Sequence, residues 1–366
     1  MKKVYNSGEL SLQSSYVSPM NKSKKKTEDI RQFILENVED HPSTITSVTS
    51  AKFGISRQAS HRHIQKLVME GLVVAHGATR DRVYEVKPLV EFSLALPLNG
   101  LEEDKVWRQH IRPLLENLPS NILQICQYGF TEIVNNAIDH SEGTELSIFL
   151  KRTYKTIEIN LVDNGVGIFA KIQKELNLDD QLHAILELSK GKLTTDPAHH
   201  TGEGIFFTSR MFDEFSILSG KLYFKHFEPD NDWLLENTSE LHKGTDIQMI
   251  ISSKSSRTTK QVFDRFTVEG DYGFSKTHVP VFLAAYGDEN LISRSQAKRL
   301  LARFERFKEI VLDFENVDSI GQAFADEIFR VFQKQHPTIH LTYINTNKQV
   351  QDMIMRATSR LTDQRY

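Results

Sequence analysis

The chain has 366 residues, more than one hydrophobic core usually holds, so two or three domains are expected. With 39% hydrophobic residues, 25% charged residues and a net charge of -3, its composition is that of a globular protein. Its apolar stretches, such as VPVFLAAY, are far shorter than the roughly 20 residues of a membrane helix. The N-terminal MKKVYNSGEL lacks the apolar core of a signal peptide, and the single Cys126 excludes an internal disulfide framework, so a cytoplasmic protein without membrane contact is expected.

The first 26 residues are rich in Ser, Lys and Asn and end in KSKKK. They show no hydrophobic periodicity, which predicts a disordered basic tail over 1–26. Residues 1–92 carry 14 Lys and Arg against 10 Asp and Glu, whereas the remaining residues carry 31 against 38. This asymmetry indicates that the N-terminal part meets a polyanion.

Three helices and a hairpin are predicted over residues 27–92. TEDIRQFILENVED places its apolar residues on one helical face behind Thr27 as N-cap, and TITSVTSAKFG is a second short helix that ends at Gly54. A third helix begins at Ser56 and ends at Gly71. LVVAHGATRDRVYEV is two alternating strands around a glycine-containing turn, which predicts the hairpin.

This order of elements, with SRQASHRHIQKLVMEGL as the third helix, resembles the winged helix-turn-helix family. The resemblance implies a DNA-binding domain over 27–92, whose third helix enters the major groove. A winged helix used for protein contact is the alternative that the modest positive charge leaves open. The residues implied for DNA are Arg57, Gln58, His61 and Arg62 at base edges or phosphates, and Arg80 and Arg82 at backbone phosphates.

In the middle of the chain, a helix from about Asn121 to His140 carries polar residues along one side of an apolar pattern. Glu132 and Asn136 recur four residues apart, and Asp139 or His140 continues the row. Such a row suits a metal–nucleotide complex, with an oxygen of Asn136 on Mg2+ and with Glu132 polarising a water molecule. A solvated helix face is the alternative for this row taken alone.

Three glycine-containing segments follow this helix. IEINLVDNGVGI is an alternating strand that ends at Asp163 and is followed by two glycines. HHTGEGIFFTSRMFDEF has GEG at the start of a helix, whose free N–H groups suit a phosphate. HKGTDIQMII places a Gly-Thr pair at the start of another apolar strand.

The helix and the three segments, in this order, resemble the N, G1, G2 and Gly-Thr motifs of the GHKL ATPases, which include gyrase B, heat-shock protein 90, sensor histidine kinases and anti-sigma-factor serine kinases. The resemblance covers residues 100–252 and implies a Bergerat-type α/β sandwich that binds ATP and Mg2+. It implies that Asp163 bonds the adenine amino group with support from Thr245, and that Asn136 holds the metal ion. The residues implied for the nucleotide are Asn136, Asp139, His140, Asp163, Gly165, Gly167, Gly202, Gly204 and Thr245.

Glu132 separates the branches of this family, because sensor histidine kinases usually have Asn at its place. The resemblance therefore implies Glu132 as the general base, and TEIVNNAIDHS looks closest to the anti-sigma serine kinases. Residues 169–201 would form the mobile ATP lid. The second glycine motif has few glycines and is soon followed by Phe206 and Phe207, which departs from the family pattern for phosphate binding. The candidate phosphate contacts in the lid are Lys190, Lys192, His199 and His200.

The C-terminal third begins with a serine-rich stretch, which predicts a linker over 253–268 and a small α/β domain over 269–366. From THVPVFLAAYG onward, strands alternate with helices, which predicts a mainly parallel sheet. VLDFENVDSIGQAFADEIF resembles the STAS domain of anti-anti-sigma factors, in which a serine at the strand-to-helix turn is phosphorylated. Ser319 is the candidate phosphoacceptor at that place, although Ile320 departs from the motif. A serine that only caps the following helix is the alternative.

The sequence thus predicts a multidomain α/β protein with a winged helix, a GHKL sandwich and a STAS-like domain. The favoured function is an ATP-binding, ATP-hydrolysing and DNA-associated switch in transcription regulation. A homodimer is expected, with a protein partner at the STAS-like domain. Two alternatives stay open: a serine kinase of the anti-sigma type acting on Ser319 or on a partner's STAS domain, and a non-enzymatic ATP-binding interaction module.

Overall fold

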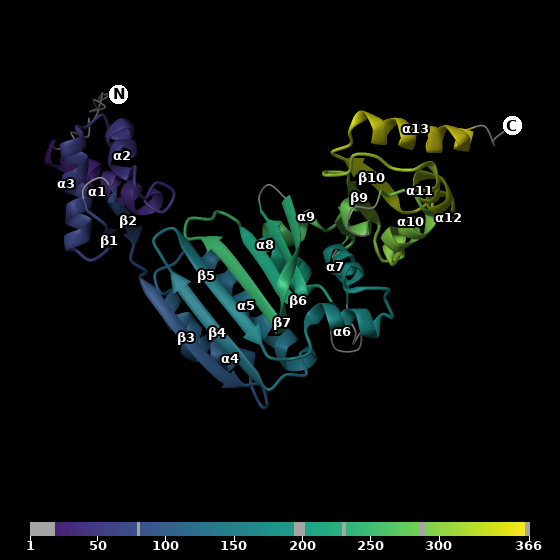
Figure 1. The fold of residues 1–366 in the computed structure, drawn as a ribbon, viewed down its shortest axis with the longest axis horizontal. Coiled ribbons are helices and arrows are strands. Elements are labelled where there is room, and N and C mark those ends of the chain that lie inside the picture. Colours follow the sequence, from purple (N-terminus) through teal and green to yellow (C-terminus); the bar gives the residue numbers. More distant parts are fainter. Residues whose placement is uncertain are drawn as a thin grey trace, which may run out of the picture. The chain divides into compact units, whose positions relative to one another are not determined.

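The computed structural model describes residues 19–78, 81–193, 202–228, 232–271, 273–285 and 290–362. The chain divides into two compact units (Figure 1). The first comprises the described residues up to Leu89 together with Thr153–Lys155, and the second comprises Val90–Arg152 with the described residues from Thr156 onward. Helices and several sheets are present, which confirms the mixed α/β, multidomain character predicted from the sequence.

The first unit consists of three helices and an antiparallel hairpin. Its first helix begins at Pro19 rather than at Thr27, so it includes residues 19–26 of the predicted tail. Proline suits a helix start because its missing N–H needs no partner there, and lysine is a good helix former. Residues 1–18 of the predicted tail lie outside the described residues. The elements are α1 (Pro19–Asn37), α2 (Ile45–Phe53), α3 (Arg57–Met69), β1 (Val73–His76) and β2 (Val83–Val86).

Local signals in the sequence set the ends of α2 and α3. Gly54 follows α2 with a positive φ of 61°, the left-handed conformation that ends a helix. Ser56 precedes α3, and its hydroxyl accepts a hydrogen bond from the Ala59 N–H at 3.1 Å, as a helix N-cap does. The buried side chains of Ile64 and Leu67 direct one face of α3 into the core of this unit.

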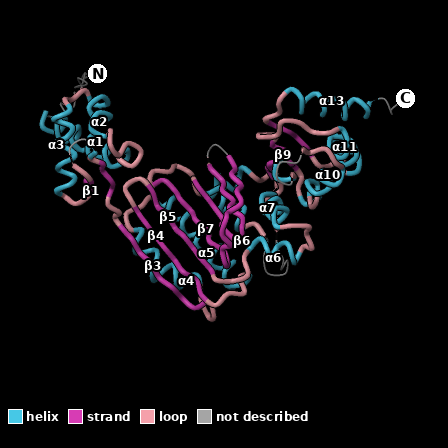
Figure 2. The backbone as a smooth tube through the Cα atoms, viewed as in Figure 1, coloured by secondary structure: helices cyan, strands magenta, loops and turns pink. Residues whose placement is uncertain are grey.

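The second unit is built around a five-stranded antiparallel sheet in the order β3-β4-β5-β7-β6. Figure 2 shows the strands side by side, with α5 behind them. Strand β3 begins before residue 100, where the predicted nucleotide domain starts, and pairs along its whole length with β4. The strands are β3 (Val90–Pro97), β4 (Glu145–Arg152), β5 (Thr156–Asp163), β6 (Glu214–Phe227) and β7 (Asp232–Ser252).

The helices between these strands bury apolar faces against the sheet. Helix α5 has Ile125, Phe130 and Val134 fully buried, and they share one hydrophobic cluster with Ile157 and Ile159 of β5. The helices are α4 (Glu103–Val106), a π-helical segment (Trp107–Ile111), a 3-10 segment (Arg112–Leu115), α5 (Ser120–His140), α6 (Ile168–Glu175), α7 (Gln181–Lys190) and α8 (Gly204–Met211).

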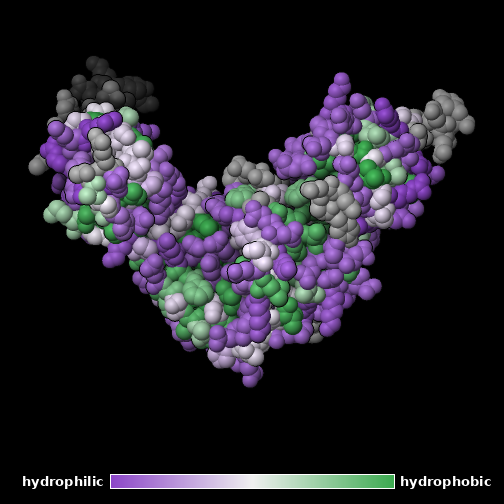
Figure 3. Space-filling model, viewed as in Figure 1, coloured by the Kyte–Doolittle hydropathy of each residue, from purple (hydrophilic) through white to green (hydrophobic). Residues whose placement is uncertain are grey.

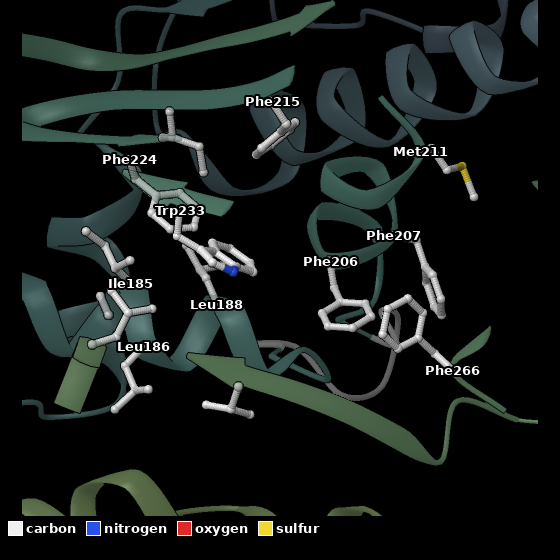
Figure 4. Close-up of a cluster of buried hydrophobic side chains, with 14 of the residues drawn as sticks. Ile185, Leu186, Leu188, Phe206, Phe207, Met211, Phe215, Phe224, Trp233 and Phe266 are labelled. Carbon is white, nitrogen blue, oxygen red and sulfur yellow. The ribbon is translucent and has the colours of Figure 1, made fainter. Parts of the chain in front are cut away.

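The segment predicted as a linker, 253–268, instead contains helix α9 (Thr259–Arg265), which begins with a capping box at Thr258. Phe266 packs against Phe206 and Phe207 of α8, with ring centroids 4.9 and 6.2 Å apart. Figure 4 shows these three rings together in the buried cluster. Apolar residues at helical spacing therefore outweigh the polar start of the segment, and the chain after β7 packs on the sheet domain.

The rest of the second unit, from β8 to α13, is a small α/β layer that we call the C-terminal layer. Its three strands are parallel and lie in the order β10-β9-β8, which confirms the parallel sheet predicted from alternating strands and helices. The strands are β8 (Lys276–Pro280), β9 (Glu309–Asp313) and β10 (His340–Ile344). The helical segments are Val281–Ala284, α10 (Arg294–Leu301), Phe304–Arg306, α11 (Gln322–Asp326), Glu327–Phe332, α12 (Gln333–Gln335) and α13 (Lys348–Thr362).

A single cluster of buried hydrophobic residues runs through the five-stranded sheet domain and on into the C-terminal layer, from Leu98 to Ala357. Figure 3 shows one face of the sheet, where hydrophobic residues gather over β3 and β4. Phe149 of β4 is 47% exposed. None of the helices in the described residues is both long and apolar enough to span a bilayer.

Candidate functional site

A cavity of about 320 Å³ lies in the second unit, within the size range of small-molecule pockets. It is lined by residues of α5, the end of β5, the part of β7 that pairs with β5 and the segment from α6 to α8, and we call it the α5 cavity. Asp139, which is exposed, and Gly165 are not among its lining residues. The sequence-predicted residues that line it are Glu132, Asn136, His140, Asp163, Gly167, Gly202, Gly204 and Thr245.

Helix α5 supplies three polar residues to one wall of this cavity. Glu132, Asn136 and His140 lie four residues apart, so the helical repeat places them in one row. The other side of the helix is buried in the core, where Cys126 and Val134 are fully buried. The amphipathic pattern of α5 thus fixes which of its residues meet the cavity.

Asp163 forms the buried polar end of the cavity. It is 8% exposed and lies at the end of β5. Its partner across the sheet is Thr245, the first residue of β7 that pairs with β5. Its Oδ1 accepts a hydrogen bond from the Gly165 N–H at 2.8 Å. Burial raises the pKa of the Asp163 carboxyl, and the bonds from Gly165 and Thr245 oppose that shift. The carboxylate is held in place and can accept a further bond from an N–H donor in the cavity.

The opposite end of the cavity is formed where α8 begins. A Cβ at position 204 would overlap Oε2 of Glu132, so only glycine lets this carboxylate approach the first residue of α8. Gly202 has a positive φ of 71°, and a side chain there would overlap the backbone of Leu193. Free N–H groups and the positive end of the helix dipole at such a start favour an anion.

Two further charged residues lie near Glu132. Burial, together with the carboxylates of Glu132 and Glu203, raises the pKa of the Tyr128 phenol, which places both acids close to that ring. Burial also raises the pKa of Glu203, against the influence of Lys192. Of these charged residues only Glu132 lines the cavity, and Glu203 directly precedes α8. Among the described residues, no three His, Cys, Asp or Glu side chains gather where they could hold a metal ion by themselves.

Lys171 is a cavity residue that the sequence reasoning missed. Its Nζ lies 2.8 Å from Glu142 Oε1 and 3.4 Å from Glu175 Oε1, and its side chain is only 15% exposed. The spacing of residues in α6 could have predicted this position. Ile168, Lys171 and Ile172 recur at helical spacing directly after the first glycine motif, and all three line the cavity.

Two helices, α6 and α7, occupy most of residues 169–193, the described part of the predicted lid, and Phe169 and Ile185 are fully buried in them. Lys190 is also fully buried and donates to Glu187 and to carbonyl oxygens of the C-terminal layer, so the prediction of a phosphate contact is wrong for Lys190. Residues 194–201, with His199 and His200, lie outside the described residues.

In the first unit, two of the predicted DNA-contacting residues of α3, Gln58 and Arg62, lie on the side opposite the buried Ile64 and Leu67. Arg57, Gln58 and Arg62 are exposed, and His61 is half-buried beside them. On the hairpin, Arg82 is half-buried, and Arg80 lies outside the described residues.

Ser319 lies in the loop between β9 and α11 and is half-buried. Helix α11 has Gly321 at its N-cap position without a side-chain cap, so the alternative in which Ser319 caps this helix is wrong. Asn347 Nδ2 donates to the carbonyl oxygens of Val317 and Asp318 at 3.1 and 2.8 Å, which holds the backbone next to the serine.

Comparison with known families finds a match for part of the C-terminal layer. Residues 296–351 match the family described as a STAS-like domain of unknown function (DUF4325). The match runs from α10 into α13 and includes Ser319, so the C-terminal layer carries a STAS-like domain. A search of curated proteins finds no match. The winged-helix and GHKL resemblances of the preceding residues stay predictions.

Proposed function

We propose that the second unit binds ATP in the α5 cavity and hydrolyses it, as the ATP-driven part of a regulatory switch. The observation that carries this proposal is that one cavity is lined by two carboxylates in different surroundings. Asp163 is buried and bonded to Thr245, and Glu132 is in contact with Gly204 at the start of α8. An acceptor suits the amino group of adenine, and a helix start suits phosphates.

Each residue then has a stated task. Asp163 accepts a hydrogen bond from the adenine amino group, and the first N–H groups of α8 bind the phosphates. Asn136 would hold Mg2+ through its side-chain oxygen, and the ion would neutralise phosphate charge. Glu132 takes a proton from the water that attacks the terminal phosphorus, while the bond from that phosphorus to the ADP oxygen breaks.

The experiment compares ATP binding and phosphate release in wild type, Glu132→Ala and Asp163→Asn. Wild type is expected to bind ATP and to release phosphate with Mg2+. Glu132→Ala should keep affinity within a few-fold and lose about 100-fold or more in turnover, the usual effect of removing a general base. Asp163→Asn should bind ATP about tenfold or more weakly, because its acceptor is replaced by an amide that cannot make the same charge-assisted bond.

Surface variants of the same chemistry serve as controls. Glu102→Ala and Asp104→Asn alter exposed acids on the surface of the second unit, away from the lining of the cavity, and should behave as wild type. Equal turnover in Glu132→Ala and wild type would reject Glu132 as the base. ATP binding without phosphate release in wild type would favour the non-enzymatic binding module.

Mass spectrometry of the same samples tests the kinase alternative. Incubation with ATP and Mg2+ should leave the peptide that contains Ser319 unmodified if the protein is an ATPase. A phosphate on that peptide, lost in Glu132→Ala, would instead support a serine kinase of the anti-sigma type.

We propose DNA binding by the first unit as a second activity. The specific observation is the exposed row of Gln58 and Arg62 on α3, four residues apart and opposite the buried Ile64 and Leu67, with the exposed Arg57 as the first residue of the same helix. Such a row can reach base edges and phosphates together when a helix lies in the major groove.

A further inference from the structure

Three consecutive residues at the end of α7, Lys190, Gly191 and Lys192, are bonded to the C-terminal layer through side chains and backbone together. We call these residues, with Thr277 and residues 299–306, the clasp. The bonds are Lys190 Nζ to the carbonyl oxygens of Arg299 and Ala302, both at 3.0 Å, Thr277 Oγ1 to Lys190 O at 2.7 Å, Arg303 Nη2 to Gly191 O at 2.7 Å, Arg306 Nη1 to Lys192 O at 2.9 Å, and Lys192 Nζ to Arg306 O at 2.9 Å.

Buried charges complete the clasp. Glu187 Oε1 accepts from Lys190 Nζ at 2.6 Å, and Arg303 Nη1 lies 3.0 Å from Glu187 Oε2. Glu187 is 2% exposed and Lys190 is fully buried. Burial alone would raise the pKa of Glu187, but Lys190, His183 and Arg303 together hold it well below its usual range. Buried ion pairs of this kind add little net stability over apolar packing, yet they strongly disfavour any arrangement that leaves one charge unpaired.

Backbone strain is found on both sides of the clasp. Lys192 has a φ of 52° and Arg303 a φ of 65°, the left-handed region that costs a residue with a side chain on the order of 1 kcal/mol. Neither residue is glycine, so the bonds that they make to each other's segments hold them in that conformation. Conformations of this kind persist where the surrounding structure over-determines them, and they are frequent at functional sites.

The clasped residues are continuous with the wall of the α5 cavity. Leu188 and Leu193, on either side of them, both line it. The Leu193 N–H donates to the Gly202 carbonyl oxygen at 3.0 Å, which ties this wall to the segment that leads into α8. A displacement of Lys190–Lys192 therefore displaces Leu193 and, through it, Gly202 and the helix start beside Glu132.

We propose that Arg303 and Arg306 are positioning residues for the α5 cavity, through which the STAS-like C-terminal layer sets the affinity for nucleotide. The inference rests on the proposed ATP binding. The coupling is reciprocal by thermodynamic linkage, so nucleotide in the cavity also stabilises the clasp and changes the state of the C-terminal layer that a partner meets. The positioning is local, through bonds to the backbone of residues 190–192, and Arg303 and Arg306 do not line the cavity.

The test uses the full chain and two readouts. In Arg303→Ala and Arg306→Ala, the dissociation constant of a non-hydrolysable ATP analogue is expected to rise about fivefold or more, the size of typical coupling between sites. Hydrogen exchange without nucleotide should become faster in the peptide that ends at Leu193. In wild type, the analogue should slow exchange in residues 299–306, and this slowing should be lost in Arg303→Ala.

Two matched arginine variants separate positioning from general damage. Arg306→Lys can still donate to the Lys192 carbonyl oxygen and should bind the analogue as tightly as wild type. Arg306 is exposed, so the lysine ammonium at this position stays in contact with water. Arg330→Ala removes a partly exposed arginine paired with Asp326 inside the C-terminal layer and should change neither readout.

The outcomes separate this inference from the proposed function. If wild type binds no nucleotide, the proposed function fails and the coupling fails with it. If wild type binds the analogue while Arg303→Ala and Arg306→Ala bind equally well, only the positioning role is overturned. Unchanged exchange at Leu193 in a folded Arg303→Ala protein overturns it as well.

Discussion

Glu132 and Gly204 meet where helix α8 begins, and their contact leaves no room for a side chain at position 204. The carboxylate and the free N–H groups of the helix start thus share one small region of the cavity. An alanine at position 204 would have to displace either the carboxylate or the helix start. The proposed hydrolysis needs both groups in place.

We therefore expect Gly204→Ala to reduce ATP turnover about tenfold or more, because sub-ångström placement of the catalytic group decides the rate. Phosphate-release assays measure the effect, and thermal unfolding checks that the variant is folded. Gly273→Ala is the matched control, because a Cβ there meets nothing within 4 Å. Wild-type turnover in Gly204→Ala would show that Glu132 is not confined by this contact.

At the scale of elements, α3 has one face buried in the first unit and the opposite face exposed. Ile64 and Leu67 anchor it, Arg62 lies on the free side, and the exposed Arg57 is the first residue of the helix. A cationic side chain on such a face contributes to affinity for DNA mainly by releasing counterions from phosphates.

We expect Arg57→Ala and Arg62→Ala to weaken binding to a 30-base-pair mixed-sequence duplex, and each to lower the slope of log affinity against log salt by about one. Fluorescence anisotropy across a salt series measures both effects. Lys87→Ala, an exposed cation after β2, controls for the loss of charge alone. If all three variants weaken binding equally, α3 has no special place at the DNA. No binding by wild type at low salt would favour the protein-contact alternative.

At the scale of the whole molecule, two separate hydrophobic clusters underlie the two compact units. The larger cluster joins the five-stranded sheet domain to the C-terminal layer through aromatic residues around Phe274. Its ring lies 4.5 Å from that of Phe206 on α8 and 5.3 Å from that of Phe307 before β9. The sheet domain and the C-terminal layer should therefore unfold together.

Calorimetry should show two transitions, one for each unit, and Phe274→Ala should lower only the midpoint of the larger one. The expected loss is about 3–5 kcal/mol, the usual cost of deleting a buried phenylalanine side chain. Phe149→Ala removes an exposed ring from β4 and should change the midpoint little. A third transition in wild type, with only one of the three altered by Phe274→Ala, would show that the C-terminal layer unfolds independently.

Patterns within a few turns or strands were readable in the sequence. The row of Glu132, Asn136 and His140 follows from the helical repeat of α5. Ser56 is a favoured N-cap residue and predicts the start of α3. The alternation of strands and helices after β8 predicts the parallel sheet, and residues 296–351 match a STAS-like domain. Each of these features depends on residues close together in the chain, so their spacing is sufficient evidence.

Contacts between distant segments were decided only by the tertiary structure. Spacing does not reveal that Gly204 touches Glu132, that Lys190 faces the C-terminal layer rather than a phosphate, or that the predicted linker folds as α9. The physical reason is that burial and charge pairing depend on which segments meet. A lysine could bind a phosphate or a buried carboxylate, so its residue type alone does not distinguish the two roles. Glu187 and two carbonyl oxygens surround the Lys190 ammonium and hold it away from the cavity.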